Sequence, residues 1–574
     1  LKILKRCLDL SKLPRVISKS LDSLIEALRY PLRGYTLEEE NQWLEEQLEI
    51  LDIIKEYICK NICYPLNVKI KKELRWYQLY ARQKRLENKV NDVLDCIKED
   101  YEFRLYRAVQ GDFREYLDDT EKPFDEIHKE TDREMVEVCN LLRENEKTAK
   151  DIFDKFDKII KEFDSYGISV NPSHLFARFT EQYPELSVEV SGLIMANSDE
   201  VLGRFFSSFL WPLKRIEGYS TKLKQLIRKG IEAKNLLITL NIAHAYAWGG
   251  LLDEFDSGDI KNIKDLLSLK DERITSTILH AISKLGQKNS GEAKRLALLI
   301  DINKNSRLAE ELCGIFDSNH GIPPEDLDKK DVENILAKLI QMKLFDTARY
   351  HIDKFLEFVS KKYPDLSISF LIKRLRHYKL NETAEPDYRP FPYLGFRYAF
   401  AGISKTHGYE EYVRRIRDFV LDEAMKDSFW LPKLFEIVSD GYCEEALEIL
   451  DEWLEEGARV KIEAVPLLVR EAPDTFLFEN YNFVGKVILS AKKISDECLR
   501  NVQSDLFSIA ISGEWSRGFG VPSDKGLRLK KMGKEISEKL DSQHPAHEFY
   551  LKISRDGEAR IQEEFQRDEE LLDE

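Results

Sequence analysis

Two short stretches of the sequence contain residue types that could support enzyme chemistry. The glycine-rich segment 513–528 (GEWSRGFGVPSDKGLR) could cradle a phosphate, but it lacks the Lys-Ser or Lys-Thr end that reaches phosphate and Mg²⁺. His544 and His547 could share a helix face and bind a metal ion, yet Pro545 separates them and no second ligand pair is evident. We therefore expect a surface loop at the first stretch and no metal site at the second.

Other catalytic signatures are missing from the sequence. It contains no Walker loop, dinucleotide-binding fingerprint, zinc-protease histidine pair or serine nucleophile elbow, and its ten histidines are scattered. The 104 acidic residues are too numerous for any pair to stand out as a general acid and base. We expect a protein that is not an enzyme, with no catalytic residue and no cofactor.

A different kind of chemistry is suggested by residues 421–433 (LDEAMKDSFWLPK), namely cleavage of the chain itself by a protease. The helical pattern ends near Met425, which is one of only five methionines, and capping residues and a proline follow it. A protease binds its substrate as an extended strand, and a helix end is easier to unravel than a helix centre. The Met425–Lys426 bond is therefore a candidate scissile bond, with Ala424 and Asp427 as possible recognition residues beside it.

A second Met-Lys bond occurs at Met342–Lys343. It continues an amphipathic pattern and has no proline nearby, although it too could approach a helix end. We favour Met425–Lys426 over this alternative.

Residues 69–89 form the most basic stretch of the chain, and three aromatic residues are interleaved with the charges. Its candidate partner-binding residues are Lys71, Lys72, Arg75, Arg82 and Arg85. On a helix they would make a positive face suited to nucleic acid or to an acidic protein. The alternative is a solvated face that faces the acidic remainder of the chain.

Composition predicts an all-α protein. The 574 residues are 33% charged and 43% hydrophobic, with only 26 Gly and 18 Pro, which favours helices over β-sandwiches or disorder. The net charge of -16 argues against nonspecific nucleic-acid binding as the main role of the surface. No apolar run is long enough for a membrane span and LKILKRCLDL is too short and mixed for a signal peptide, so we expect a cytoplasmic protein without membrane contact.

The eight cysteines lie far apart in the sequence. Cys59 and Cys63 have i, i+4 spacing on an apparent helix, but no second pair accompanies them. This pattern is typical of buried reduced thiols rather than a metal site or disulfide framework.

The helical pattern divides the chain into four regions. Residues 1–166 contain long helices at 36–60, 67–108 and 129–165. Gly167 and Asn171-Pro172 then break the rhythm, and residues 167–383 resemble an irregular α-solenoid of the HEAT or tetratricopeptide type. Residues 384–400 form a strap, and residues 401–574 form a helical C-terminal domain that contains the cleavage site.

The strap (AEPDYRPFPYLGFRYAF) combines three prolines with six aromatic residues. The prolines prevent a continuous helix. A free linker would not carry this much apolar surface, so we expect the strap to lie against a domain face, with partner binding as the alternative. We also expect the 400–425 segment to pack with the C-terminal part of the chain.

This arrangement resembles the protein substrate of type III-E CRISPR systems. In those systems a tetratricopeptide-CHAT caspase-like protease, bound to a single-chain RNA-guided effector in the Craspase assembly, cuts a helical partner when target RNA is present. Members of that substrate family are cut at a Met-Lys bond, which here matches Met425 and Lys426. The resemblance spans the full length in architecture, but its specific motif is short.

The resemblance implies a function for each fragment. The N-terminal fragment, residues 1 to about 425, would bind an extracytoplasmic-function-type sigma factor and, with other proteins of the locus, restrain transcription or growth. Residues 426–574 would dock on the protease. The alternative function is a helical-repeat scaffold or sensor of another prokaryotic defence system, without proteolytic processing.

Overall fold

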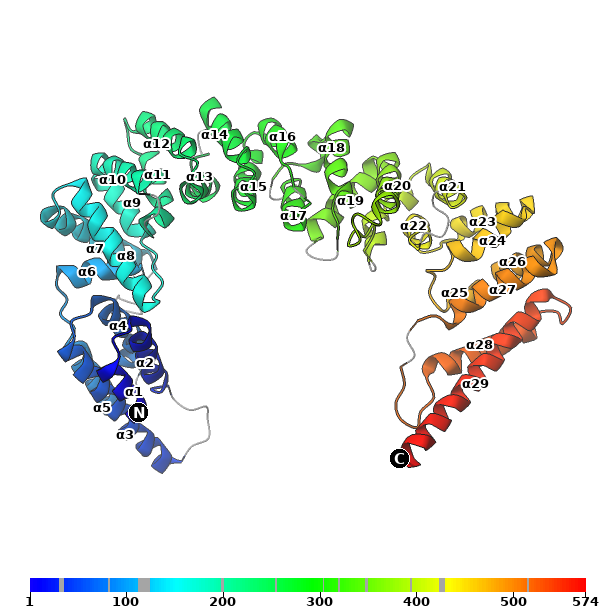
Figure 1. Ribbon diagram of the computed structural model, residues 1–574, viewed down its shortest axis with the longest axis horizontal. Helices are drawn as coiled ribbons and strands as arrows, with labels where there is room; N and C mark the ends of the chain where they lie inside the picture. Colours follow the sequence, from blue (N-terminus) through cyan, green and yellow to red (C-terminus); the bar gives the residue numbers. More distant parts are fainter. Residues whose placement is uncertain are drawn as a thin grey trace. The chain divides into compact units, whose positions relative to one another are not determined.

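In the computed structural model, helices follow one another along the described parts of the chain (Figure 1). It describes residues 1–29, 36–80, 83–111, 124–197, 201–252, 255–302, 304–317, 321–345, 349–392, 395–422, 429–513 and 516–573. These residues contain no β-strand. The predicted all-α class is confirmed, and the chain divides into two compact units, Leu1–Lys284 and Leu285–Glu574.

The first unit contains the helices up to α15, whose last residues cross the unit boundary. They are α1 (Lys2–Leu10), α2 (Pro14–Glu26), α3 (Leu37–Lys60), α4 (Tyr64–Tyr80), α5 (Lys84–Leu94), α6 (Tyr101–Gln110), α7 (Phe124–Asn145), α8 (Ala149–Tyr166), α9 (Ser173–Gln182), α10 (Pro184–Ala196), η2 (Val201–Phe205), α11 (Ser207–Leu213), α12 (Ser220–Glu232), α13 (Leu236–Trp248), α14 (Ser257–Leu267) and α15 (Glu272–Gly286).

Capping residues set the limits of the first long helices. The Thr36 side chain and Glu39 form a capping box at the start of α3, which matches the helix predicted at 36–60. Thr148 and Asp151 form another capping box, so the predicted helix at 129–165 is wrong and is divided into α7 and α8. A Thr-x-x-Asp signal inside a continuous helical pattern marks this break.

The helix predicted at 67–108 is also wrong, because three helices occupy this stretch. Gln83 has an extended backbone at the start of α5. The Asp100 carboxylate accepts the N–H of Phe103 and begins α6. The described basic residues of the 69–89 stretch are therefore divided between α4 and α5.

Alternate helices stack on one another in the middle of the first unit. One layer contains α7, α9, α11 and α13, and the other contains α8, α10, α12 and α14. The buried residues of each helix recur at the spacing that places them on one face. In α8, for example, Ile152, Phe156 and Phe163 are buried. This is the two-layer arrangement of a helical-repeat protein, while the HEAT or tetratricopeptide assignment stays a prediction.

The second unit continues the all-helical pattern. Its helices are α16 (Ser290–Leu299), α17 (Ser306–Ile315), η3 (Pro324–Asp326), α18 (Lys329–Ile340), α19 (Tyr350–Lys362), α20 (Pro364–Asn381), η4 (Phe396–Phe400), η5 (Ile403–Lys405), α21 (Tyr409–Phe419), α22 (Leu431–Val438), α23 (Glu444–Glu456), α24 (Arg459–Leu468), α25 (Phe476–Glu479), α26 (Tyr481–Ile494), α27 (Asp496–Ile511), α28 (Asp524–Lys539) and α29 (Pro545–Asp573). Helices α16, α18 and α20 stack in order, and α17 stacks on α19.

The last two helices, α28 and α29, pack closely along their length. Glycines permit this approach: a Cβ atom on Gly557 would lie 2.6 Å from the backbone nitrogen of Lys530, and one on Gly533 would lie 2.9 Å from the backbone nitrogen of Ser554. Any larger residue must push the two backbones apart.

We expect Gly557→Ala to destabilise this helix pair by about 1–3 kcal/mol, because the added methyl group overpacks the contact. Hydrogen exchange should show faster opening of the amides in α28 and α29. Gly192→Ala in α10 is the matched control, since a Cβ atom there meets nothing within 4 Å. It should stabilise its helix by roughly 0.5–1 kcal/mol through helix propensity. Equal effects of the two substitutions would contradict the packing argument.

Candidate functional site

The predicted cleavage site lies between two anchored segments of the second unit. Ala424, Met425, Lys426 and Asp427 themselves fall outside the described residues, so their position at a helix end stays a prediction. On the N-terminal side, the Asp422 carboxylate lies 3.6 Å from the Arg376 guanidinium of α20.

The C-terminal side of the candidate site is held by Trp430. Its indole is buried, and its ring centroid lies 6.4 Å from that of Tyr378 in α20 and 6.3 Å from that of Phe391 in the strap. The neighbouring Phe429 is 54% exposed. Both segments that flank the candidate bond therefore contact the same helix, α20.

The alternative bond, Met342–Lys343, is held inside the fold. The Met342 side chain is only 1% exposed. Its carbonyl oxygen, which a protease would have to attack, accepts a hydrogen bond of 3.0 Å from Arg374 Nη1. The next carbonyl, that of Lys343, accepts the N–H of Arg389 at 2.7 Å. A protease could reach this bond only after local unfolding.

Arg374 joins the end of α18 to the strap. Its Nη1 donates to the carbonyls of Leu339 and Ile340 at 2.7 and 3.2 Å, where a helix leaves its last carbonyls without intrahelical partners. Its Nε and Nη2 donate to the carbonyls of Pro390 and Arg389, both at 2.6 Å. The side chain is fully buried, and this burial lowers the pKa of Arg374 to about 10. The guanidinium is still charged near neutral pH, because this value lies well above 7.

Two aromatic side chains, one of them from the strap, lie against this guanidinium. It lies over the rings of Phe345 and Tyr388, 4.1 and 4.8 Å from their centroids. The Tyr388 hydroxyl donates to the Ile340 carbonyl at 2.6 Å, and Phe391 and Phe396 are fully buried. The strap lies against a helical face as expected, although Tyr393 is outside the described residues and Tyr398 is 67% exposed.

Helix α21, which precedes the candidate bond in sequence, packs on α22 and α23, which follow it. Arg414 and Arg417 both bond the Glu452 carboxylate, with shortest distances of 2.7 Å each. Arg417 is buried, also donates to the Ile449 carbonyl at 2.6 Å, and lies 5.0 Å from the Trp453 ring centroid. The hydrogen bonds from Arg414 and Arg417 hold the pKa of Glu452 below its usual range. The expected packing of the 400–425 segment with the C-terminal part is confirmed for α21.

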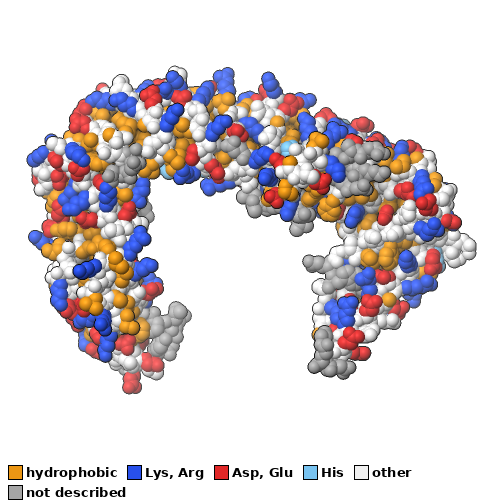
Figure 2. Space-filling model, in the orientation of Figure 1, with side chains coloured by type: hydrophobic (Ala, Val, Ile, Leu, Met, Phe, Trp, Pro, Cys, Tyr) orange, Lys and Arg blue, Asp and Glu red, His pale blue; other side chains and the backbone are white. Residues whose placement is uncertain are grey.

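The predicted basic face has acidic neighbours. Lys71 pairs with Glu99, and Arg85 on α5 pairs with Glu45 of α3 at 2.7 Å. Lys72 and Arg75 on α4 also have interaction partners, and Arg82 lies outside the described residues. On the face drawn in Figure 2, basic and acidic side chains are interspersed. These contacts favour the alternative of a solvated face that pairs with the acidic remainder of the chain.

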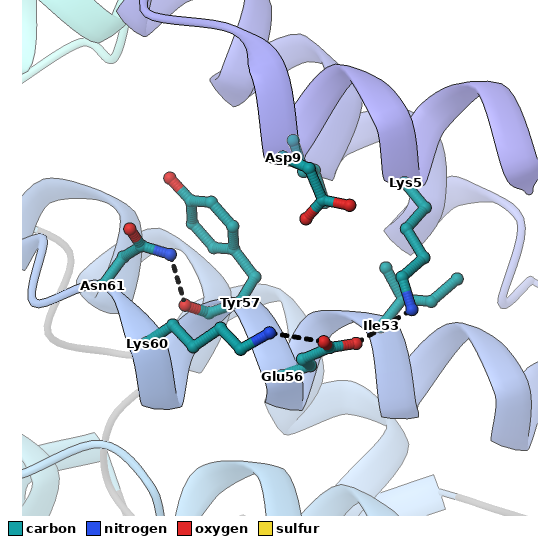
Figure 3. Close-up of a pocket in the computed structure, with 8 residues that line it drawn as sticks. Lys5, Asp9, Ile53, Glu56, Tyr57, Lys60 and Asn61 are labelled. Atoms are coloured by element: carbon teal, nitrogen blue, oxygen red, sulfur yellow. Dashed lines mark hydrogen bonds and ion pairs between the residues drawn. The ribbon is translucent and has the colours of Figure 1, made fainter.

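A small surface pocket lies between α1 and α3 (Figure 3). Its central carboxylate, Glu56, accepts hydrogen bonds from Lys5 at 2.9 Å and Lys60 at 2.5 Å. The bonds from Lys60 and Lys5 lower the pKa of Glu56 to about 2. Lys5, Glu56 and Lys60 therefore pair with one another, and the Asp9 carboxylate lines the same pocket.

The two stretches with possible enzyme chemistry have structural roles in the second unit. Arg517 and the Gly520 N–H both bond the Asp568 carboxylate of α29, and Ser523 caps α28, so part of the glycine-rich segment holds the last two helices together. His544 Nδ1 accepts the N–H of Ala546 at the start of α29. Within the described ranges, no three or more metal-ligating side chains gather into a cluster.

Comparison with known proteins does not assign this chain to a family. No protein-family model matches it, and no curated protein matches it either. Among the helices of the described parts of the chain, none combines the length and apolar character needed to cross a bilayer.

We expect Arg374→Met to free the strap, because each buried carbonyl left without a donor costs about 1–3 kcal/mol. Unfolding in urea should shift to lower concentration, and limited trypsin digestion should accelerate after Lys343 and Arg389. Lys373→Met is the matched control on the same helix, since Lys373 is exposed. Unchanged digestion of the Arg374 variant would show that this residue does not hold the strap.

Proposed function

We propose that this chain is a non-enzymatic antiviral effector of a type III-E CRISPR system. In this proposal, an RNA-activated CHAT caspase-like protease, bound to its RNA-guided effector, cuts the Met425–Lys426 bond in the cytoplasm. The N-terminal fragment then binds an extracytoplasmic-function-type sigma factor, with an accessory protein of the locus as a further partner, and affects transcription or growth.

The observation that carries this proposal is that one of the two Met-Lys bonds, Met342–Lys343, is held inside the fold. The Met342 side chain is buried and its carbonyl is bonded to Arg374, which makes that bond a poor protease substrate in the folded chain. Met425 itself lies outside the described residues, and Asp422 and Trp430, which precede and follow it in the sequence, both contact α20. Fixed flanks limit how far a cut between them disturbs the rest of the fold.

The packing of α21 bears on how such a cut would act. This helix stays in the N-terminal fragment, while its ion-pair partner Glu452 goes to the C-terminal fragment. A buried arginine that bonds both a carboxylate and a carbonyl is costly to separate from them and is little screened by salt. We therefore propose that cutting alone leaves the fragments together, and that partner binding separates them.

The cleavage site is tested by incubating the full chain with the target-activated protease complex and measuring the intact masses of the products. We expect one fragment that ends at Met425 and one that begins at Lys426. Met425→Ala should reduce cleavage at least tenfold, because a protease pocket selects its substrate by shape and contact.

Met342→Ala is the matched control for this experiment and should leave the cleavage rate of the folded chain unchanged. Products that end at Met342 would contradict the site assignment. A chain that the activated protease leaves intact, but that still captures a partner, would favour the scaffold alternative.

The association of the fragments is tested by size-exclusion chromatography of fully cut protein at 150 mM salt. We expect the fragments to elute together. Arg417→Ala should weaken their association by roughly fivefold or more, because it leaves the buried Ile449 carbonyl without its donor, which costs about 1–3 kcal/mol. Arg415→Ala, an exposed arginine of the same helix, is the control. If the fragments without a substitution elute separately, the proposal that partner binding separates them is contradicted.

A further inference from the structure

Two cysteines that are distant in sequence meet at the ends of α3 and α5. Cys59 Sγ donates to Cys96 Sγ at a sulfur–sulfur distance of 2.8 Å, and Cys96 Sγ donates to the Asp92 carbonyl at 3.6 Å. Cys59 is exposed, so a small oxidant can reach it. The sequence prediction of buried thiols on one helix is wrong here, since α3 ends at Lys60 and Cys63 lies beyond it.

Two ion pairs show the register between the two helices. Asp52 pairs with Lys89 at 2.5 Å, and Lys55 pairs with Asp92 at 3.8 Å. In each pair the partner lies 37 residues further along the chain, as Cys96 does from Cys59. The helices therefore run parallel, and their carboxyl ends coincide at the two thiols.

We infer that Cys59 and Cys96 form an oxidative modification site, a dithiol that closes to an intramolecular disulfide when it meets a peroxide. The peroxide first oxidises the exposed Cys59 thiol to a sulfenic acid, and one molecule of water leaves. The Cys96 sulfur then attacks the Cys59 sulfur, a second water leaves, and the S–S bond forms. Overall, two thiols lose two electrons and two protons, and the peroxide is reduced.

The geometry of the two thiols favours a reactive pair over two thiols that only fill space in the fold. Burial, followed by the hydrogen bond from Cys59, raises the pKa of Cys96 to about 11, so Cys96 is the thiol less suited to react first. Its sulfur already contacts the atom that it must attack, and no large backbone movement is needed. The new bond would close a loop that contains α4 and α5, the helices that carry Lys71, Lys72, Arg75 and Arg85.

This inference rests only on the packing of α3 against α5 and does not depend on the proposed proteolysis. It is tested by treating the reduced full chain with a small excess of hydrogen peroxide, blocking free thiols and digesting with trypsin without reduction. We expect the peptides 56–60 (EYICK) and 90–98 (VNDVLDCIK) to appear as one cross-linked species, 2 Da lighter than their sum.

Variants and thermal unfolding complete the test. Oxidation should raise the midpoint of unfolding because the cross-link restricts the unfolded chain, and dithiothreitol should reverse the rise. Cys59→Ser and Cys96→Ser should each abolish the cross-link and the rise, whereas Cys7→Ser should preserve both. A disulfide between two chains, peroxide oxidation confined to Cys59 with Cys96 still free, or Zn²⁺ binding by the two thiols that blocks oxidation would each overturn the inference.

Discussion

Much of the second unit depends on one requirement, that buried backbone carbonyls find donors. At the end of α18 the helix can no longer supply N–H groups, and in the strap the prolines remove them. Arg374 supplies donors to the carbonyls of both segments, because a guanidinium offers five N–H groups in a planar fork. Its position over two aromatic rings offsets part of the cost of burying a charge.

This single side chain links fold to proposed function. By bonding the Met342 carbonyl it removes one Met-Lys bond from reach. By fixing the strap it also places Phe391 where Trp430 can pack, and so anchors the chain just beyond the other Met-Lys bond. The two bonds have only the Met-Lys pair in common, and these contacts hold the Met342–Lys343 bond inside the fold. A second buried arginine, Arg417, then ties the two sides of the candidate cut together.

Many charged side chains of the described helices form ion pairs with other residues of the same chain. The chain is acidic overall, yet its most basic stretch finds carboxylates on neighbouring helices, as Arg85 does at Glu45. Individually, such exposed pairs contribute little stability. Two of the pairs, Asp52–Lys89 and Lys55–Asp92, have the same sequence offset as Cys59 and Cys96, so they share one register between α3 and α5.

Local sequence determined the all-α class, the limits of α3 through its Thr36 capping box, and the burial of the proline-aromatic strap. These features depend on neighbours within a few residues, where periodicity and capping chemistry act. Tertiary structure alone decided that Arg374 meets Met342, that Arg417 meets Glu452 and that Cys59 meets Cys96. An arginine on the apolar face of α20 was a signal in the sequence, but its partners were not. The physical reason is that each contact joins groups more than thirty residues apart in the sequence, and helix packing, not local periodicity, brings them together.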